Sequence, residues 1–178
     1  MKKLYSAVLT LLLCLALLAP TIAAAQAEAT CPAIATNNAI VVSNSTNQPD
    51  AQLVRPAVYK IEGYNYFRLR DLAMLLRGSG KQFAVAYDAA SNSVSISSGQ
   101  PYTVVGGELS GVAAERGSAI RSNDAVRING SPATLTAYKI DGANYFKLRD
   151  LGRALDFYVG YDDEMKTVFL SGARAYQE

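Results

Sequence analysis

Three tyrosines stand where an aromatic side chain could bind a ligand. Tyr66 and Tyr145 each occupy the centre of an Asn-Tyr-Phe tripeptide, and Tyr158 follows a further phenylalanine. Strand alternation places all three on the polar face of the predicted sheet, where an exposed ring can stack on a sugar or anchor a protein interface. Cross-strand packing on an open sheet face explains the same pattern. We predict a candidate binding surface at these tyrosines, with packing as the alternative.

An arginine–aspartate pair follows each of the two tripeptides. Arg70-Asp71 and Arg149-Asp150 fall at the start of predicted helices, where a carboxylate favours the positive helix end. Adjacent residues on a helix do not face each other, so no ion pair is expected within either dipeptide. The arginines either cover the sheet edge with their stems or bind an anion. We therefore add Arg70 and Arg149 to the candidate binding surface.

The chain contains no histidine, the commonest general base and metal ligand. This excludes Ser-His-Asp and Cys-His catalytic arrangements and any imidazole site for zinc or copper. After removal of the predicted leader, Cys31 is the remaining cysteine. We interpret it as a free thiol, with a disulfide to a partner chain as the alternative. The sequence predicts no catalytic residues, no metal site and no cofactor.

An internal repeat must position these residues. Residues 59–72, YKIEGYNYFRLRDL, and residues 138–151, YKIDGANYFKLRDL, are identical at 11 of 14 positions. The match resumes at residues 83–88 and 157–162, with five extra residues in the first copy. Self-similarity of this kind indicates duplication of one structural unit.

Each copy has the pattern of a strand, a glycine turn, a strand, a short helix and two further strands. Leucines at i, i+3 and i+7 form one apolar helix stripe in both copies, from Leu69 and from Leu148. Phe67 and Phe146 are predicted to point into the core, and a hairpin precedes each copy. We expect an α+β fold, in which an antiparallel sheet is built from two ββαββ-type repeats with one short helix per repeat.

The N-terminus has the features of a secretory signal peptide, with Lys2 and Lys3 before an apolar run and cleavage after Ala25 or Ala27. That run is shorter than the roughly 20 residues of a membrane span, and an uncleaved membrane anchor is the alternative. Without the two lysines the charges balance, 17 − 2 = 15 basic against 15 acidic residues, so nucleic acid is not an expected partner. The expected organisation is a signal peptide (1–25), a disordered tail (26–38), repeat 1 (39–98), a linker (99–124), repeat 2 (125–173) and a tail (174–178).

The segments YKIEGYNYFRLRDLAMLL and YKIDGANYFKLRDLGRAL, each followed by an FxVxYD strand, resemble the copper amine oxidase N-terminal domain-like family, also called the stalk domain family. The resemblance covers most of residues 40–172. It implies an exported protein, secreted or attached to the cell envelope of a Gram-positive bacterium. It does not imply amine oxidation, which requires three histidine ligands and a tyrosine in an Asn-Tyr-Asp/Glu motif that this chain lacks.

We therefore expect a non-catalytic exported module that acts as a cell-envelope-associated binding or stalk domain. The alternative is a freely secreted factor that binds carbohydrate or protein, including an inhibitor. The partner stays open between cell-wall glycan and an envelope or secreted protein. No membrane span is expected after signal cleavage.

Overall fold

The computed structural model describes residues 29–45, 50–111 and 113–178, so the predicted signal peptide at residues 1–25 lies outside the described residues. Strands account for 46% of the described residues and helices for 10%. The first copy contains β1 (Thr30–Ala35), β2 (Ala39–Ser43), β3 (Gln52–Val54), β4 (Val58–Ile61), β5 (Tyr64–Arg68), α2 (Leu69–Leu75), β6 (Phe83–Asp88) and β7 (Ser93–Ser98). The second copy contains β8 (Arg116–Arg121), β9 (Ala125–Ile128), β10 (Ser131–Ala133), β11 (Ala137–Ile140), β12 (Ala143–Lys147), α3 (Leu148–Leu155), β13 (Tyr158–Asp162) and β14 (Thr167–Ser171).

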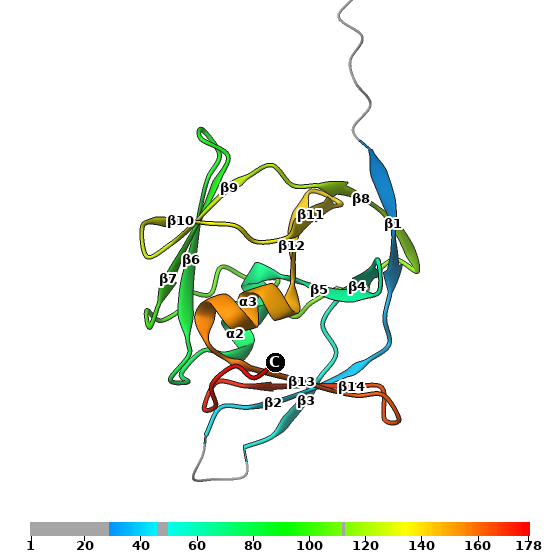
Figure 1. Ribbon diagram of the computed structural model, residues 1–178, viewed down its shortest axis with the longest axis vertical. Helices are drawn as coiled ribbons and strands as arrows, with labels where there is room; N and C mark the ends of the chain where they lie inside the picture. Colours follow the sequence, from blue (N-terminus) through cyan, green and yellow to red (C-terminus); the bar gives the residue numbers. More distant parts are fainter. Residues whose placement is uncertain (1–28, 46–49, 112) are drawn as a thin grey trace, which may run out of the picture.

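Six strands close into a barrel in the order β1-β4-β5-β12-β11-β8 (Figure 1). The two copies meet at two antiparallel seams. At the β5–β12 seam Phe67 lies opposite Phe146, its own equivalent in the other copy. At the β1–β8 seam Pro32 lies opposite Ser118, and the equivalent pairings of β1 with β4 and of β8 with β11 make these two residues counterparts as well. The barrel therefore has an approximate twofold axis that exchanges the copies.

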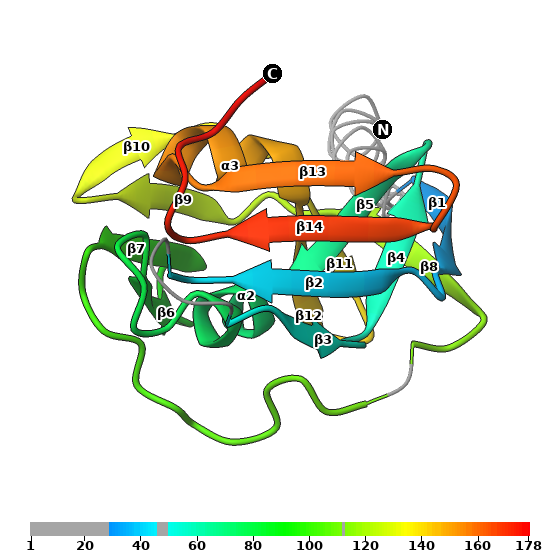
Figure 2. The same ribbon diagram turned by 90° about the horizontal axis from the view of Figure 1, so that it is seen from below.

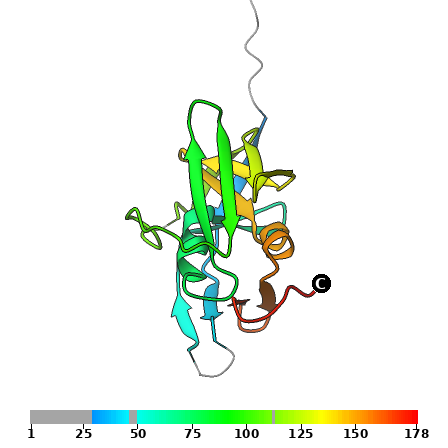
Figure 3. The same cartoon turned by 90° about the vertical axis from the view of Figure 1, so that its left-hand side faces the viewer.

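Two side sheets interlock the copies. The β2–β3 hairpin of the first copy joins β14 and β13 of the second, and the β9–β10 hairpin of the second joins β7 and β6 of the first (Figures 2 and 3). The joining pairs, β14 with β2 and β7 with β9, are parallel. Each copy completes a sheet of the other, so neither closes its own structure alone.

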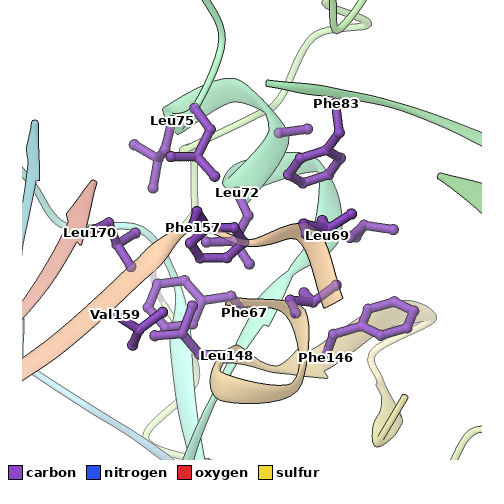
Figure 4. Packing of buried hydrophobic residues seen from close by; sticks show 14 of the residues in the cluster. Phe67, Leu69, Leu72, Leu75, Phe83, Phe146, Leu148, Phe157, Val159 and Leu170 are labelled. Carbon is purple, nitrogen blue, oxygen red and sulfur yellow. The ribbon is translucent and has the colours of Figure 1, made fainter. Parts of the chain in front are cut away.

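The copies build two hydrophobic cores. The larger core lies where both helices pack between the outer face of the barrel and the side sheets, and Phe67, Phe146, Phe83 and Phe157 are at most 1% exposed in it (Figure 4). The smaller core fills the barrel interior. The prediction that Phe67 and Phe146 are core residues is confirmed.

Local signals in the sequence are confirmed at the turns and helices. Glu62-Gly63 and Asp141-Gly142 have positive φ at both positions, as a two-residue hairpin turn requires. The helices α2 and α3 begin at Leu69 and Leu148, and their leucine stripes are buried. None of the helices in the described ranges is both long and apolar enough to span a bilayer.

The predicted fold class is wrong. The elements within each copy were expected, but they form a closed barrel with two side sheets instead of one antiparallel sheet of two ββαββ repeats. Strand β1 lies within the expected disordered tail (26–38), and β8 lies within the expected linker (99–124). Both strands are short and rich in small residues, so local pattern gave no strand signal. Pairing with each other and with β4 and β11 holds them in place.

Candidate functional site

Tyr66 and Tyr145 lie inside the barrel and not on its surface. They are 1% and 6% exposed. Tyr66 packs edge-on against Tyr138 with ring centroids 5.3 Å apart, and Tyr145 packs in the same way against Tyr59 at 5.2 Å. Closure of the barrel converts the strand face expected to be polar into a second core, so both faces of β5 and β12 are buried. The prediction that these two rings are exposed on a polar sheet face is therefore wrong.

The surroundings of the interior tyrosines disfavour ionisation. Burial raises the pKa of Tyr145 to about 12 and raises that of Tyr66 further. Burial also raises the pKa of Tyr138. The Tyr59 hydroxyl accepts a hydrogen bond from the Ala114 N–H at 3.0 Å. These rings are structural residues of the barrel interior.

Tyr158, at the start of β13, is half-buried beneath Arg174. The Arg174 guanidinium lies 4.0 Å from the ring centroid, and the Tyr158 N–H donates to the Arg174 carbonyl at 3.1 Å. This tyrosine therefore anchors the C-terminal segment to β13. The structure does not bring it together with Tyr66 or Tyr145, so the three predicted tyrosines do not form one surface.

Arg70 and Arg149, in contrast, are exposed and line two equivalent grooves. The Arg70 groove has a volume of about 740 Å³ and the Arg149 groove about 250 Å³. The lining of the Arg70 groove includes Arg68, Arg70, Asp71, Val85, Tyr87, Glu108, Lys139 and Asn144. The lining of the Arg149 groove includes Asn38, Lys60, Tyr64, Asn65, Lys147, Arg149, Val159 and Tyr161.

Both copies contribute to each groove. The Arg70 groove lies between the β11–β12 hairpin of the second copy and the α2, β6 and β7 elements of the first. The Arg149 groove lies between the β4–β5 hairpin of the first copy and the α3, β13 and β14 elements of the second. The approximate twofold axis exchanges the two sites, and a single copy would form neither.

Exposed tyrosines line the grooves, and they are not the ones that the sequence indicated. Tyr87 at the end of β6 is 48% exposed in the Arg70 groove, and its equivalent Tyr161 at the end of β13 is 42% exposed in the Arg149 groove. Tyr64 is 49% exposed in the Arg149 groove, where Ala143 stands in the Arg70 groove. The repeated FxVxYD strand held a signal for Tyr87 and Tyr161, because each tyrosine recurs just before the aspartate that ends its strand.

A loop built from residues 99–111 forms an extra wall of the Arg70 groove and lies along one edge of the molecule (Figure 2). The Glu108 carboxylate holds the loop together, accepting hydrogen bonds from the Tyr102 hydroxyl at 2.7 Å and from the backbone N–H groups of Val105 and Gly106 at 3.0 Å each. The hydroxyl and these N–H groups lower the pKa of Glu108 to about 2. Internal hydrogen bonds thus fix this wall.

The Arg68–Asp71 ion pair at the start of helix α2 holds the same loop through hydrogen bonds to its backbone. The buried Asp71 carboxylate accepts a hydrogen bond from Arg68 Nε at 2.8 Å and another from the Leu109 N–H at 3.0 Å. Arg68 also donates to the carbonyl oxygens of Gly107 and Ser110. As expected, Asp71 does not pair with its neighbour Arg70. Within the described ranges Arg70 makes no ion pair, and it lines the groove.

Cys31 is half-buried on β1, and its Sγ lies 3.7 Å from the Ala119 carbonyl oxygen across the β1–β8 seam. It does not line either groove. Within the described ranges, no three Asp, Glu or Cys side chains converge in a way that could hold a metal ion.

No family model matches the chain, and neither a curated protein nor a solved structure matches it.

Proposed function

We propose that this chain is a non-catalytic exported module that binds the cell envelope through its two grooves, and that it belongs with the stalk domain proteins that its repeated motifs resemble. One observation carries the proposal. Each of the two equivalent grooves places an exposed tyrosine, Tyr87 or Tyr161, in the same lining as an exposed arginine, Arg70 or Arg149.

This combination suits a carbohydrate polymer. The face of a tyrosine ring packs against the C–H face of a sugar, and a guanidinium donates several hydrogen bonds in one plane to hydroxyl or charged oxygens. Neither groove is an enclosed cavity, so a segment within a polymer has access to the lining residues. Two sites on one rigid body also allow two segments of one polymer to bind together, which raises the overall affinity above that of either site.

The groove carboxylates support binding over catalysis. Asp71 is engaged by Arg68 and the loop backbone, and Glu108 is engaged by Tyr102 and two backbone N–H groups. A general acid or base needs access to the proton that it transfers. The two carboxylates instead serve to position the loop, and the sequence offers no histidine for that role.

A freely secreted factor that binds protein is the second candidate. Val104 and Val105 are 47% and 59% exposed on the loop that borders the Arg70 groove. Adjacent exposed β-branched side chains at the rim of a groove suit a protein interface better than they suit a glycan. The two candidates differ in whether the grooves or the loop bind the partner.

Retention of the mature protein on purified bacterial cell walls tests the proposal. We expect the Tyr87→Ala, Tyr161→Ala double variant to bind at least about ten-fold more weakly, since each lost ring contact is worth about 1 kcal/mol. Leu53→Ala is the control, because Leu53 is also exposed but lies outside both grooves. Unchanged retention of the double variant would refute a role for the grooves. Capture by supernatant proteins, lost on replacing Val104 and Val105 by serine, would establish the alternative.

A further inference from the structure

One difference between the two grooves lies in the turn that joins the barrel to a side sheet. Residues 34–39, IATNNA, follow β1 into β2, and residues 120–125, IRSNDA, follow β8 into β9. The equivalent pairings of β1 with β4 and of β8 with β11 place these segments in register. Asn38 in the first copy therefore stands where Asp124 stands in the second.

In the second copy this aspartate completes a network beneath the Arg70 groove. Asp124 Oδ1 lies 2.8 Å from Lys139 Nζ, and Asp124 Oδ2 accepts a hydrogen bond from Asn144 Nδ2 at 2.8 Å. The Ser122 hydroxyl reaches Asn144 Oδ1 at 3.4 Å. The Asp124 side chain is 5% exposed; burial alone would raise its pKa, but Lys139 and Asn144 outweigh burial and lower it.

In the first copy the same network lacks its charge. The equivalents of Lys139, Asn144 and Ser122 are Lys60, Asn65 and Thr36. Among the described residues Lys60 has no ion-pair partner, and Asn65 Oδ1 and Thr36 Oγ1 are buried without a hydrogen-bond partner. Buried polar atoms without partners are costly, so these two atoms make the turn beside Lys60 a candidate position for a bound group.

Lys60 belongs to a groove whose lining residues carry an excess of positive charge. Lys60, Lys147 and Arg149 line the Arg149 groove, and none of its lining residues is acidic. Carboxylates nevertheless adjoin the lining along the chain, with Glu62 next to Gly63, Asp150 next to Arg149 and Asp162 next to Tyr161. Asp150 accepts a hydrogen bond from the Thr136 N–H, Asp162 accepts one from the Met165 N–H, and Asp163 is ion-paired with Lys166 at 2.7 Å. Lys166 and, to a lesser extent, Lys60 lower the pKa of Asp163.

Aromatic rings complete this site. Tyr64 and Tyr161 are both exposed in the Arg149 groove, and Lys147 Nζ lies 3.4 Å from the centroid of the Tyr64 ring. The ammonium group is thereby held against the face of the ring. Cations beside two rings match a ligand that carries negative charge on a chain of sugars or polyols.

We propose that the Arg149 groove binds an oxyanion, phosphate or carboxylate, carried on a polyhydroxylated polymer. Lys60, Lys147 and Arg149 neutralise the anion, and the two tyrosines contact the chain. This inference rests on the proposed function and names its substrate class. The Arg70 groove lacks this specificity, because Asp124 already compensates Lys139 and because Arg68 is bound by Asp71 and loop carbonyls.

The substitution Asn38→Asp tests the assignment by giving the first copy the carboxylate of the second. Binding of a glycerol phosphate oligomer and of a galacturonate oligomer to the mature protein is measured by calorimetry, with a neutral N-acetylglucosamine oligomer for comparison. We expect Asn38→Asp to weaken oligoanion binding at least about ten-fold, because a fixed negative charge beside Lys60 opposes the anion at short range. The melting temperature is not expected to fall, because the new carboxylate completes the network, so lost binding cannot be ascribed to misfolding.

Asn123→Asp is the matched control. Asn123 is exposed in the equivalent turn of the second copy, so the substitution changes the net charge by the same amount but away from the Arg149 groove. Binding is expected to stay within about two-fold of the parent, because charges beyond about 8 Å are screened at physiological salt. The tighter of the two oligoanions identifies phosphate or carboxylate as the charged group. Parent protein that binds neither oligoanion, or Asn38→Asp protein that binds as the parent does, overturns the inference.

Wall retention separates this inference from the proposed function. Loss of oligoanion binding in Asn38→Asp, in a parent that is not retained on walls, supports the anion site and refutes the envelope role. The opposite outcome is retention on walls that the double tyrosine variant loses, but that neither Asn38→Asp nor added salt changes. That outcome supports the envelope role and refutes the anion site.

Discussion

Replacing Asp71 by alanine removes the group that attaches helix α2 to the wall of the Arg70 groove. Asp71 is 1% exposed and accepts two hydrogen bonds, one from the Arg68 guanidinium at 2.8 Å and one from the Leu109 N–H at 3.0 Å. Its counterpart Asp150 is half-buried and accepts one hydrogen bond, from the Thr136 N–H at 3.1 Å. The aspartate of the repeated Arg-Asp dipeptide therefore has two hydrogen-bond partners in the first copy and one in the second.

The expected magnitudes follow from burial and from the number of partners lost. Breaking one side of a buried ion pair costs about 3–5 kcal/mol, and Arg68, whose side chain is 25% exposed, reaches water well enough to place the loss near 3 kcal/mol. Loss of one backbone hydrogen bond at the half-buried Asp150 costs about 1 kcal/mol. We therefore expect Asp71→Ala to lower the free energy of unfolding by about 2 kcal/mol more than Asp150→Ala.

Urea denaturation followed by circular dichroism measures both free energies. Limited proteolysis provides a second readout, since loss of the Leu109 hydrogen bond frees the loop and should speed cleavage near Val104 in Asp71→Ala alone. Equal destabilisation by the two variants, with equal cleavage rates, would show that the Asp71 contacts contribute nothing beyond the helix-start role that both aspartates share.

Two further predictions concern the cores. Phe67→Ala should lower the free energy of unfolding by about 3–5 kcal/mol, because the ring is fully buried at the β5–β12 seam, and Phe67→Leu should lower it less. A decrease below about 1 kcal/mol for Phe67→Ala in urea denaturation would contradict this packing. Alkaline pH should destabilise the fold, because the pKa of Tyr145 is raised from 10.0 to about 12 and the unfolded chain therefore releases that proton first. The stabilisation is complete below pH 10.0 and is lost as the pH rises to about 12. Measuring the free energy of unfolding over this interval, with tyrosinate absorbance to follow ionisation, tests the prediction. A free energy of unfolding that does not change over the interval would show that the interior tyrosines are exposed to water.

Local sequence signals proved reliable where the interaction itself is local. The Glu62-Gly63 and Asp141-Gly142 turns, the leucine stripes and the two inward phenylalanines depend on contacts within a few residues, and all are present. The exported location, the family resemblance and the absence of catalysis stay predictions.

The binding residues show where alternation along a strand misleads. It placed Tyr66 and Phe67 on opposite faces of β5 correctly, but it assigned Tyr66 to solvent. Whether the second face of a strand meets water depends on what lies beyond it, and here five other strands close around it. Arg70 and Arg149, by contrast, are exposed, as a binding role requires. Both are exposed because they occupy helix positions that no other element covers.

The repeated unit, its turns, its helices and the apolar side chains of each element follow from the sequence alone, because they depend on neighbours along the chain. Which copy each strand joins is set by long-range pairing in the folded protein. Antiparallel pairing of Phe67 with Phe146 sets the approximate twofold axis, closes the barrel over Tyr66 and Tyr145, and brings Arg70 and Arg149 to grooves that both copies line. Such long-range pairings leave no periodicity in the sequence, since they depend on the closing of one surface against another.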